Sequence, residues 1–206
     1  MRSCGIGLML EVGSRHEHAS EAGLSHFIEH LLFKGTPRHD SRALADQINL
    51  LGGNVNAYTT QESIVLHAKT VEGKAAATLE LLAEMLLTSV FDAEEIARER
   101  RVILEEWKMI EDDPVELSLD LFLRQLWPGH VLGRPIIGER ATIKKFGRKS
   151  VLDFWRREFR PERLVIALAG SYDEREVGRV IARTFGKLES AGKRAATPAE
   201  QGTLDP

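Results

Sequence analysis

Hydrophobic residues recur along this chain with two different spacings, one typical of strands and the other of helices. Residues 4–12 form a short, glycine-spaced apolar run, which predicts a buried strand. From residue 24 onward the apolar residues recur every three or four positions, and this spacing predicts a helix that ends before Pro37. Residues 54–71 are dense in Val, Thr, Tyr and Ile, and they predict two strands with a turn near Gln61.

The rest of the chain is dominated by helical spacing. We predict further helices at residues 41–51, 73–90, 93–111, 114–127, 148–158 and 173–186, one more strand at 164–170, and loops at 13–23 and 128–140. The paired strands within 54–71 argue for antiparallel pairing, so we expect an α+β fold with a mostly antiparallel sheet packed against several helices. Residues 1–188 are predicted to form this one domain. Residues 189–206 hold a single Leu and no aromatic residue, and we predict a linker there.

The composition of the 206-residue chain is that of an ordinary globular protein, with 43% hydrophobic and 29% charged residues. A net charge of −3 and an aromatic content of 6% disfavour nucleic-acid binding. The single cysteine, Cys4, excludes an internal disulfide framework and a cysteine-based zinc site. No apolar run approaches the ~18 residues of a membrane span and no export signal is visible, so we predict a cytoplasmic protein without membrane association.

The segment His26-Phe27-Ile28-Glu29-His30 carries the residues most suited to chemistry. Residues four apart lie on one face of a helix, so His26 and His30 are able to present two imidazoles to one metal ion, and zinc accepts imidazole nitrogen. Glu29 lies beside this pair, where its carboxylate is able to take a proton from water at the metal. This H-x-x-E-H order is the inverzincin signature. Taken alone, the motif leaves metal binding and chance placement on a charged helix equally open.

A catalytic zinc site needs a third protein ligand, and the predicted helix at 93–111 offers candidates. Glu99 and Glu106 follow one line of its apolar stripe, at positions where Leu would be expected. A carboxylate that faces a core is costly unless it is paired or binds a metal. The alternative is a slightly rotated helix whose glutamates face water and pair with Arg100 or Arg101. The motif upstream favours the ligand interpretation.

Four segments of the chain, in order, resemble those of one protein family: HFIEHLLFKGT (26–36), LGGNVNAYTTQES (51–63), ERRVILEEWKMIEDDP (99–114) and GHVLGRPIIGE (129–139). Together they resemble the N-terminal, catalytic half of the pitrilysin, insulin-degrading enzyme and mitochondrial-processing-peptidase family, and its bacterial processing-peptidase-like branch most of all. The resemblance covers about residues 5–188. It implies one half of a two-half metallopeptidase architecture, and a first strand that precedes residue 5 in family members.

The resemblance also implies roles for individual residues of the metal site. His26, His30 and Glu106 would ligate one Zn²⁺ ion, and Glu29 would be the general base. Glu99 matches the acidic residue one heptad before the third ligand, which supports the metal site by contacting a ligand and not the metal itself. Carboxylates in such positions orient ligating histidine rings and raise their basicity.

Further residues are implied to bind substrate. Asn56 and Ala57 match a pair that opens a strand, and this strand is expected to bind an extended peptide by strand addition. Phe33 matches an aromatic position near the residue after the scissile bond. For Phe33, plain packing in the core is an equally good interpretation.

These inferences predict a zinc-dependent endopeptidase, a hydrolase that cleaves extended peptides or unfolded segments with metal-activated water. Family members are about twice this length, and their second half closes around the substrate. We therefore expect a second homologous half or a dimer partner. The alternative is a catalytically incomplete or non-catalytic half that associates with another chain.

Overall fold

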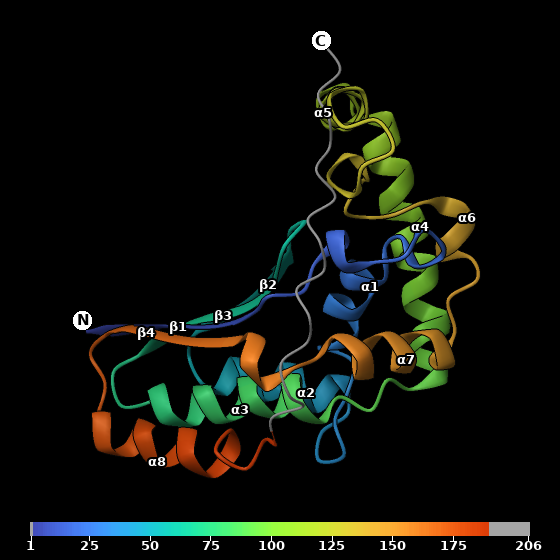
Figure 1. The fold of residues 1–206 in the computed structure, drawn as a ribbon. Helices are drawn as coiled ribbons and strands as arrows, with labels where there is room; N and C mark the ends of the chain where they lie inside the picture. Colours follow the sequence, from blue (N-terminus) through green and yellow to red (C-terminus); the bar gives the residue numbers. More distant parts are fainter. Residues whose placement is uncertain (1, 190–206) are drawn as a thin grey trace.

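The computed structural model describes residues 2–189, so the predicted linker at 189–206 lies, apart from its first residue, outside the described residues. Within them the chain forms one four-stranded antiparallel sheet with the strand order β2-β3-β1-β4 (Figure 1). The strands are β1 (Ser3–Leu10), β2 (Asn54–Thr59), β3 (Ile64–Val71) and β4 (Leu164–Gly170). The strand β2 therefore lies at an edge of the sheet.

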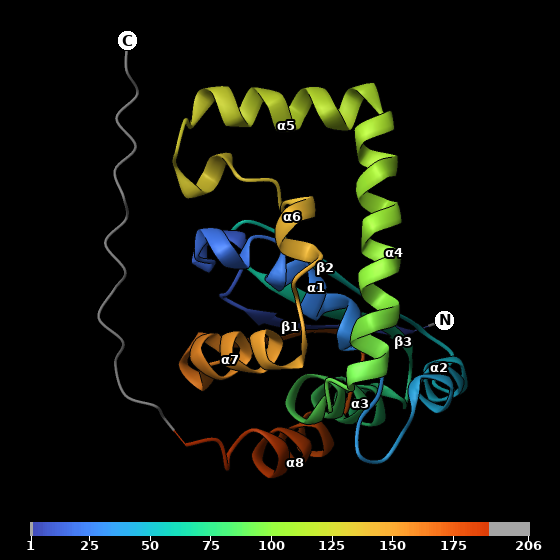
Figure 2. The ribbon, with the colours of Figure 1, turned by 90° about the vertical axis from the view of Figure 1, so that its right-hand side faces the viewer.

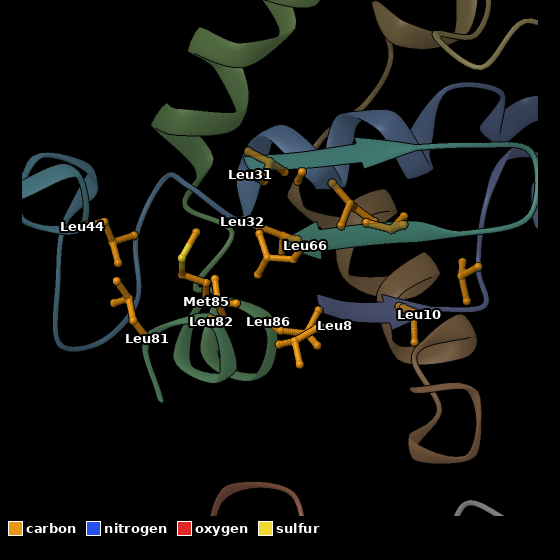
Figure 3. Close-up of a cluster of buried hydrophobic side chains, with 14 of the residues drawn as sticks. Leu8, Leu10, Leu31, Leu32, Leu44, Leu66, Leu81, Leu82, Met85 and Leu86 are labelled. Atoms are coloured by element: carbon orange, nitrogen blue, oxygen red, sulfur yellow. The ribbon is translucent and has the colours of Figure 1, made fainter. Parts of the chain in front are cut away.

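One face of the sheet forms the hydrophobic core. Every second side chain of β1 is buried, namely Cys4, Ile6, Leu8 and Leu10. Leu8 lies opposite Leu66 of β3, so the apolar faces of neighbouring strands are in register. Figure 3 shows Leu8 beside Leu86 of helix α3 (Ala75–Thr88), which packs against β1 and β3. This alternation fixes which face of the sheet the helices cover.

Eight α-helices accompany the sheet within residues 2–189. Besides α3 they are α1 (Leu24–Leu31), α2 (Ser41–Leu50), α4 (Ala93–Asp112), α5 (Pro114–Leu126), α6 (Arg140–Ile143), α7 (Arg148–Glu158) and α8 (Glu174–Thr184). The helix α8 packs against α3 on the side away from the sheet (Figure 1). In this part of the chain no helix combines the length and apolar composition needed to cross a membrane.

Helix α4 is the longest element, and it determines where the candidate ligands lie. Asp92 caps its first turn by accepting hydrogen bonds from two backbone N–H groups. Ile96 and Ile103 on its apolar side are buried, and α4 packs against α1. Asp113 ends α4 and caps α5, so α5 turns aside at the end of α4 (Figure 2).

The predicted α+β fold with an antiparallel sheet is confirmed, and the predicted helices and strands are present with small shifts at their ends. The predicted loops contain more structure than expected. Residues 13–23 include the 3₁₀ turns η1 (Ser14–His16) and η2 (Ala19–Glu21), and η3 (Val131–Gly133) lies within 128–140. Single turns of this kind are too short to show a hydrophobic period, and η1 is held partly by hydrogen bonds from Ser14 and Arg15 to the distant residues Thr60 and Gln61.

Candidate metal centre

Helix α1 is held by one apolar face, and this directs its polar side chains the other way. The buried apolar side chains are those of Leu24, Phe27, Ile28 and Leu31. His26, Glu29 and His30 occupy the remaining face and stay partly accessible. The local sequence thus places two imidazoles and a carboxylate on the side of α1 that faces away from the core.

The two histidines of α1 converge with Glu106 of α4. His26 Nε2 lies 3.8 Å from Glu106 Oε1, and His30 Nε2 lies 3.5 Å from Glu106 Oε2. A tetrahedral zinc ion bound at ~2.0–2.1 Å holds its ligand atoms ~3.4 Å apart. One donor atom of each side chain lies within 4.8 Å of the other two. The three side chains therefore fit a zinc ion with small adjustments.

The surroundings of His26 favour the neutral ring that a metal ligand requires. Burial, together with a smaller contribution from the charge of a protonated His30, lowers the pKa of His26 to about 4. Among the described residues the buried Nδ1 atom of His26 has no hydrogen-bond partner. The ring is therefore uncharged near pH 7, and its Nε2 atom is directed at Glu106.

Glu99 lies behind His30, one heptad before Glu106 on α4. Its side chain is only 6% exposed, and its Oε2 atom lies 3.2 Å from His30 Nδ1. The other oxygen lies 2.9 Å from Lys34 Nζ. Burial alone would raise the pKa of Glu99, but hydrogen bonds from His30 and Lys34 outweigh it and lower the pKa. An ionised Glu99 favours a proton on His30 Nδ1, which leaves Nε2 free to bind a metal.

Glu29 is held by a neighbour from the sheet. Thr59, the last residue of β2, donates a hydrogen bond from Oγ1 to Glu29 Oε2 at 2.5 Å. Burial raises the pKa of Glu29, although this hydrogen bond and the charge of His30 act against it. A carboxylate with a raised pKa beside a metal site is suited to accept and return a proton.

The predicted substrate-binding residues are spread over two places. Asn56 and Ala57 lie on the edge strand β2, where Ala57 is buried and Asn56 is exposed. The Ala57 N–H donates a hydrogen bond to Asn56 Oδ1 at 2.9 Å, so the Asn56 side chain covers a backbone donor of this strand. Phe33 follows α1, is half-buried and packs against the hydrophobic core.

Sequence reasoning missed two residues that contact the site. Thr59 holds Glu29, and the alternation of β2 gives a weak signal for it, because Val55, Ala57 and Thr59 share one side of the strand. Lys34, which lies three residues beyond the end of α1, pairs with Glu99, and its position outside the helix gives no periodic signal. Both contacts become evident only once α1, α4 and β2 are known to meet.

Residues 1–140 match the family model described as insulinase, peptidase family M16. The chain is 36% identical over 193 residues to YmxG of Bacillus subtilis, which is named an uncharacterized zinc protease. This match covers 94% of the chain and 47% of that relative.

Solved structures show the same fold. A protease from Helicobacter pylori superposes with a TM-score of 0.89 at 23% identity, over 97% of this chain and 48% of that one. A domain from Pseudomonas fluorescens, named a peptidase M16 inactive domain, superposes with a TM-score of 0.83 at 19% identity, over 94% and 47%. The chain thus spans about half the length of each of these proteins.

Proposed function

Because the chain belongs to the insulinase family of peptidases, family M16, we propose that it is the zinc-binding, catalytic half of a metalloendopeptidase. The observation that carries this proposal is the convergence of three donors, His26, His30 and Glu106, beside the partly buried carboxyl group of Glu29. The zinc protease name of its Bacillus subtilis relative supports the same reaction class.

The residues of this half divide the chemistry between them. A zinc ion held by His26, His30 and Glu106 would lower the pKa of a coordinated water and polarise the scissile carbonyl. Glu29 takes the proton of the attacking water and delivers it to the leaving amine. The hydrogen bond from Thr59 keeps the Glu29 carboxylate oriented for both transfers.

An extended peptide is the substrate form that suits this site. The strand β2 is an edge strand, and its last residue contacts Glu29, so a peptide added along β2 passes the proposed base. Strand addition provides affinity through backbone hydrogen bonds and places few demands on sequence. For the peptide to reach the Ala57 N–H, the Asn56 side chain has to release it.

We also propose that a second half covers part of this chain. Within the described residues no side chain of α5 is buried, and its exposed large apolar residues are Val115, Leu119, Leu121, Phe122 and Leu126. Exposed apolar surface of this kind is typical of interaction sites. The chain spans about half of its relatives, so the remaining half of a longer protein or a separate chain is the expected partner.

The second candidate is a half that binds zinc without turning over substrate. The same fold occurs in the Pseudomonas fluorescens domain that is named inactive, so the experiment has to distinguish this second candidate from the first. Glu106 is 39% exposed, and a site open to water loses part of its electrostatic catalysis.

The deciding experiment measures zinc content and the cleavage of unstructured peptides by the chain alone and with a second homologous half added. We expect one zinc per chain, and a loss of roughly 100- to 10,000-fold in rate for Glu29→Gln. Glu105→Gln is the matched control, because Glu105 is exposed on α4 and pairs with Lys108, away from the three donors. Zinc binding without turnover in either mixture would favour the non-catalytic half, and full activity of Glu29→Gln would refute the assigned base.

A further inference from the structure

Glu17 is a buried carboxyl group that the proposed reaction does not use. It is 4% exposed and belongs to the connection that joins β1 to α1 along the chain. Its Oε2 atom accepts a hydrogen bond from the Gly23 N–H at 2.8 Å, and its Oε1 atom accepts one from the Ser25 N–H at 2.7 Å. Both oxygens are therefore committed to the backbone at the start of α1.

The first N–H groups of helix α1 need a hydrogen-bond acceptor that its capping residue does not provide. The first N–H groups of any helix lack intrahelical partners, and a capping side chain normally satisfies them. Here the capping residue is Gly23, which has a φ of 100° and no side chain to offer. Glu17 takes over this function from six residues upstream, and the Ser25 N–H that it holds directly precedes His26.

Residues 134–142, a loop that runs into the start of helix α6, form further hydrogen bonds with Glu17 and with the residues before α1. Arg134 Nη1 donates a hydrogen bond to the Glu17 carbonyl oxygen at 2.9 Å, and Thr142 Oγ1 donates one to the Ala22 carbonyl oxygen at 2.7 Å. Gly138 packs so closely that a Cβ atom there would lie 2.3 Å from the Ala22 oxygen. This close contact explains the second glycine, Gly138, in the GRPIIGE part of the fourth family segment.

The segment 134–142 also connects to α4, the helix that carries Glu106, the third proposed ligand. Helix α6, which begins in this loop and includes Thr142, packs against α4. The first turn of α1 and the helix that carries Glu106 are thus tied to one segment. Displacement of a ligand by a few tenths of an ångström is enough to spoil a metal site.

We propose that Glu17, braced by the 134–142 loop, is a positioning residue that sets the direction of His26 toward Glu106. The proposal rests on the metal site proposed above. It predicts that a change at Glu17 alters the geometry of a bound metal without removing any ligand.

The test uses the full 206-residue chain and the variant Glu17→Gln. Glutamine keeps the size of the side chain but turns an NH₂ group toward one of the two backbone N–H groups, so one hydrogen bond is lost. Glu84→Gln is the matched control, because Glu84 is also a buried, hydrogen-bonded glutamate but lies on α3 and contacts Thr36 and His39. Circular dichroism first establishes that each variant is folded.

Two readouts report on the metal rather than on stability. Competition with a chromophoric chelator gives the zinc affinity, and the visible absorption of Co²⁺ bound in place of zinc reports the ligand geometry. We expect Glu17→Gln to weaken zinc binding at least tenfold and to shift the Co²⁺ spectrum, and Glu84→Gln to change the affinity less than twofold. A folded Glu17→Gln chain with wild-type affinity and spectrum overturns the positioning role.

A second variant covers the case in which Glu17→Gln does not fold. Thr142→Val removes the hydroxyl group that contacts the Ala22 and Glu139 carbonyl oxygens, and we expect it to weaken zinc binding at least threefold. An unfolded Glu17→Gln chain together with a Thr142→Val chain that binds zinc like the wild type would show that Glu17 serves folding alone. If the wild type itself binds no zinc, the proposed function fails before Glu17 is tested.

Discussion

The pH dependence of stability in a Glu17→Gln variant tests whether burial raises the pKa of the Glu17 carboxyl group. Burial raises the pKa of Glu17 from 4.5 to about 7, against the opposing hydrogen bonds from the Ser25 and Gly23 N–H groups. The folded state therefore binds this proton more tightly than the unfolded chain. The stability from this group is largest below pH 4.5 and falls as the pH rises to about 7. At about 1.4 kcal/mol per pKa unit, the fall amounts to about 3 kcal/mol.

The wild type alone would conceal this slope, because His26 produces an opposite one. Burial lowers the pKa of His26 from 6.5 to about 4, so the folded state favours its neutral ring. The stability from His26 is complete above pH 6.5 and is lost as the pH falls toward 4. Its size is also about 3 kcal/mol, so the two slopes partly cancel between pH 4.5 and 6.5. A variant that keeps His26 and removes the Glu17 titration separates them.

The assay is urea denaturation of metal-free wild type and Glu17→Gln between pH 4.5 and 8. We expect the unfolding free energy of the wild type, minus that of the variant, to fall by about 3 kcal/mol across this range. A difference that stays constant within about 0.5 kcal/mol would refute the raised pKa. A difference that rises with pH would show that the backbone N–H groups stabilise the carboxylate of Glu17 more than burial penalises it.

Three further predictions test other contacts of the site. Glu99→Gln should weaken zinc binding roughly 10- to 100-fold in chelator competition, because the His30 ring loses its orienting carboxylate, and an unchanged affinity would contradict this. Thr59→Val should move the acidic limb of the kcat/KM profile to higher pH, since the Thr59 hydrogen bond lowers the Glu29 pKa; a limb that stays in place argues against Glu29 as the base. Phe122→Ser should change the unfolding free energy by less than about 0.5 kcal/mol, because Phe122 is 58% exposed, yet weaken association with a second half in sedimentation.

Sequence spacing predicted the features of the site that depend on a single element. The interval of four between His26 and His30 needs only a helix at that position, and α1 supplies it. The interval of seven between Glu99 and Glu106 likewise needs only α4. The alternation within β1 and β3 predicted strands, and their register followed from burying one face.

Contacts between distant segments left no periodic signal. Thr59 meets Glu29 across 30 residues of sequence, and only the docking of β2 against α1 brings them together. Glu17 meets Ser25 through a connection of 3₁₀ turns whose conformation depends on Arg134, more than a hundred residues further along. Such positions are defined by tertiary structure, so spacing along the chain does not mark them.

The exposure of the three proposed ligands indicates which part of the site this half is expected to complete by itself. The side chains of His26 and His30 are 13% and 22% exposed, whereas that of Glu106 is 39% exposed. The imidazoles are thus fixed by the core beneath α1, and access increases toward α4. We therefore expect the geometry of a bound metal to be set within this half, by the packing of α1 on α4. Exclusion of water, which strengthens the electrostatic contribution to catalysis, depends on what covers the Glu106 side of the site, and there we expect the substrate and the second half to close it.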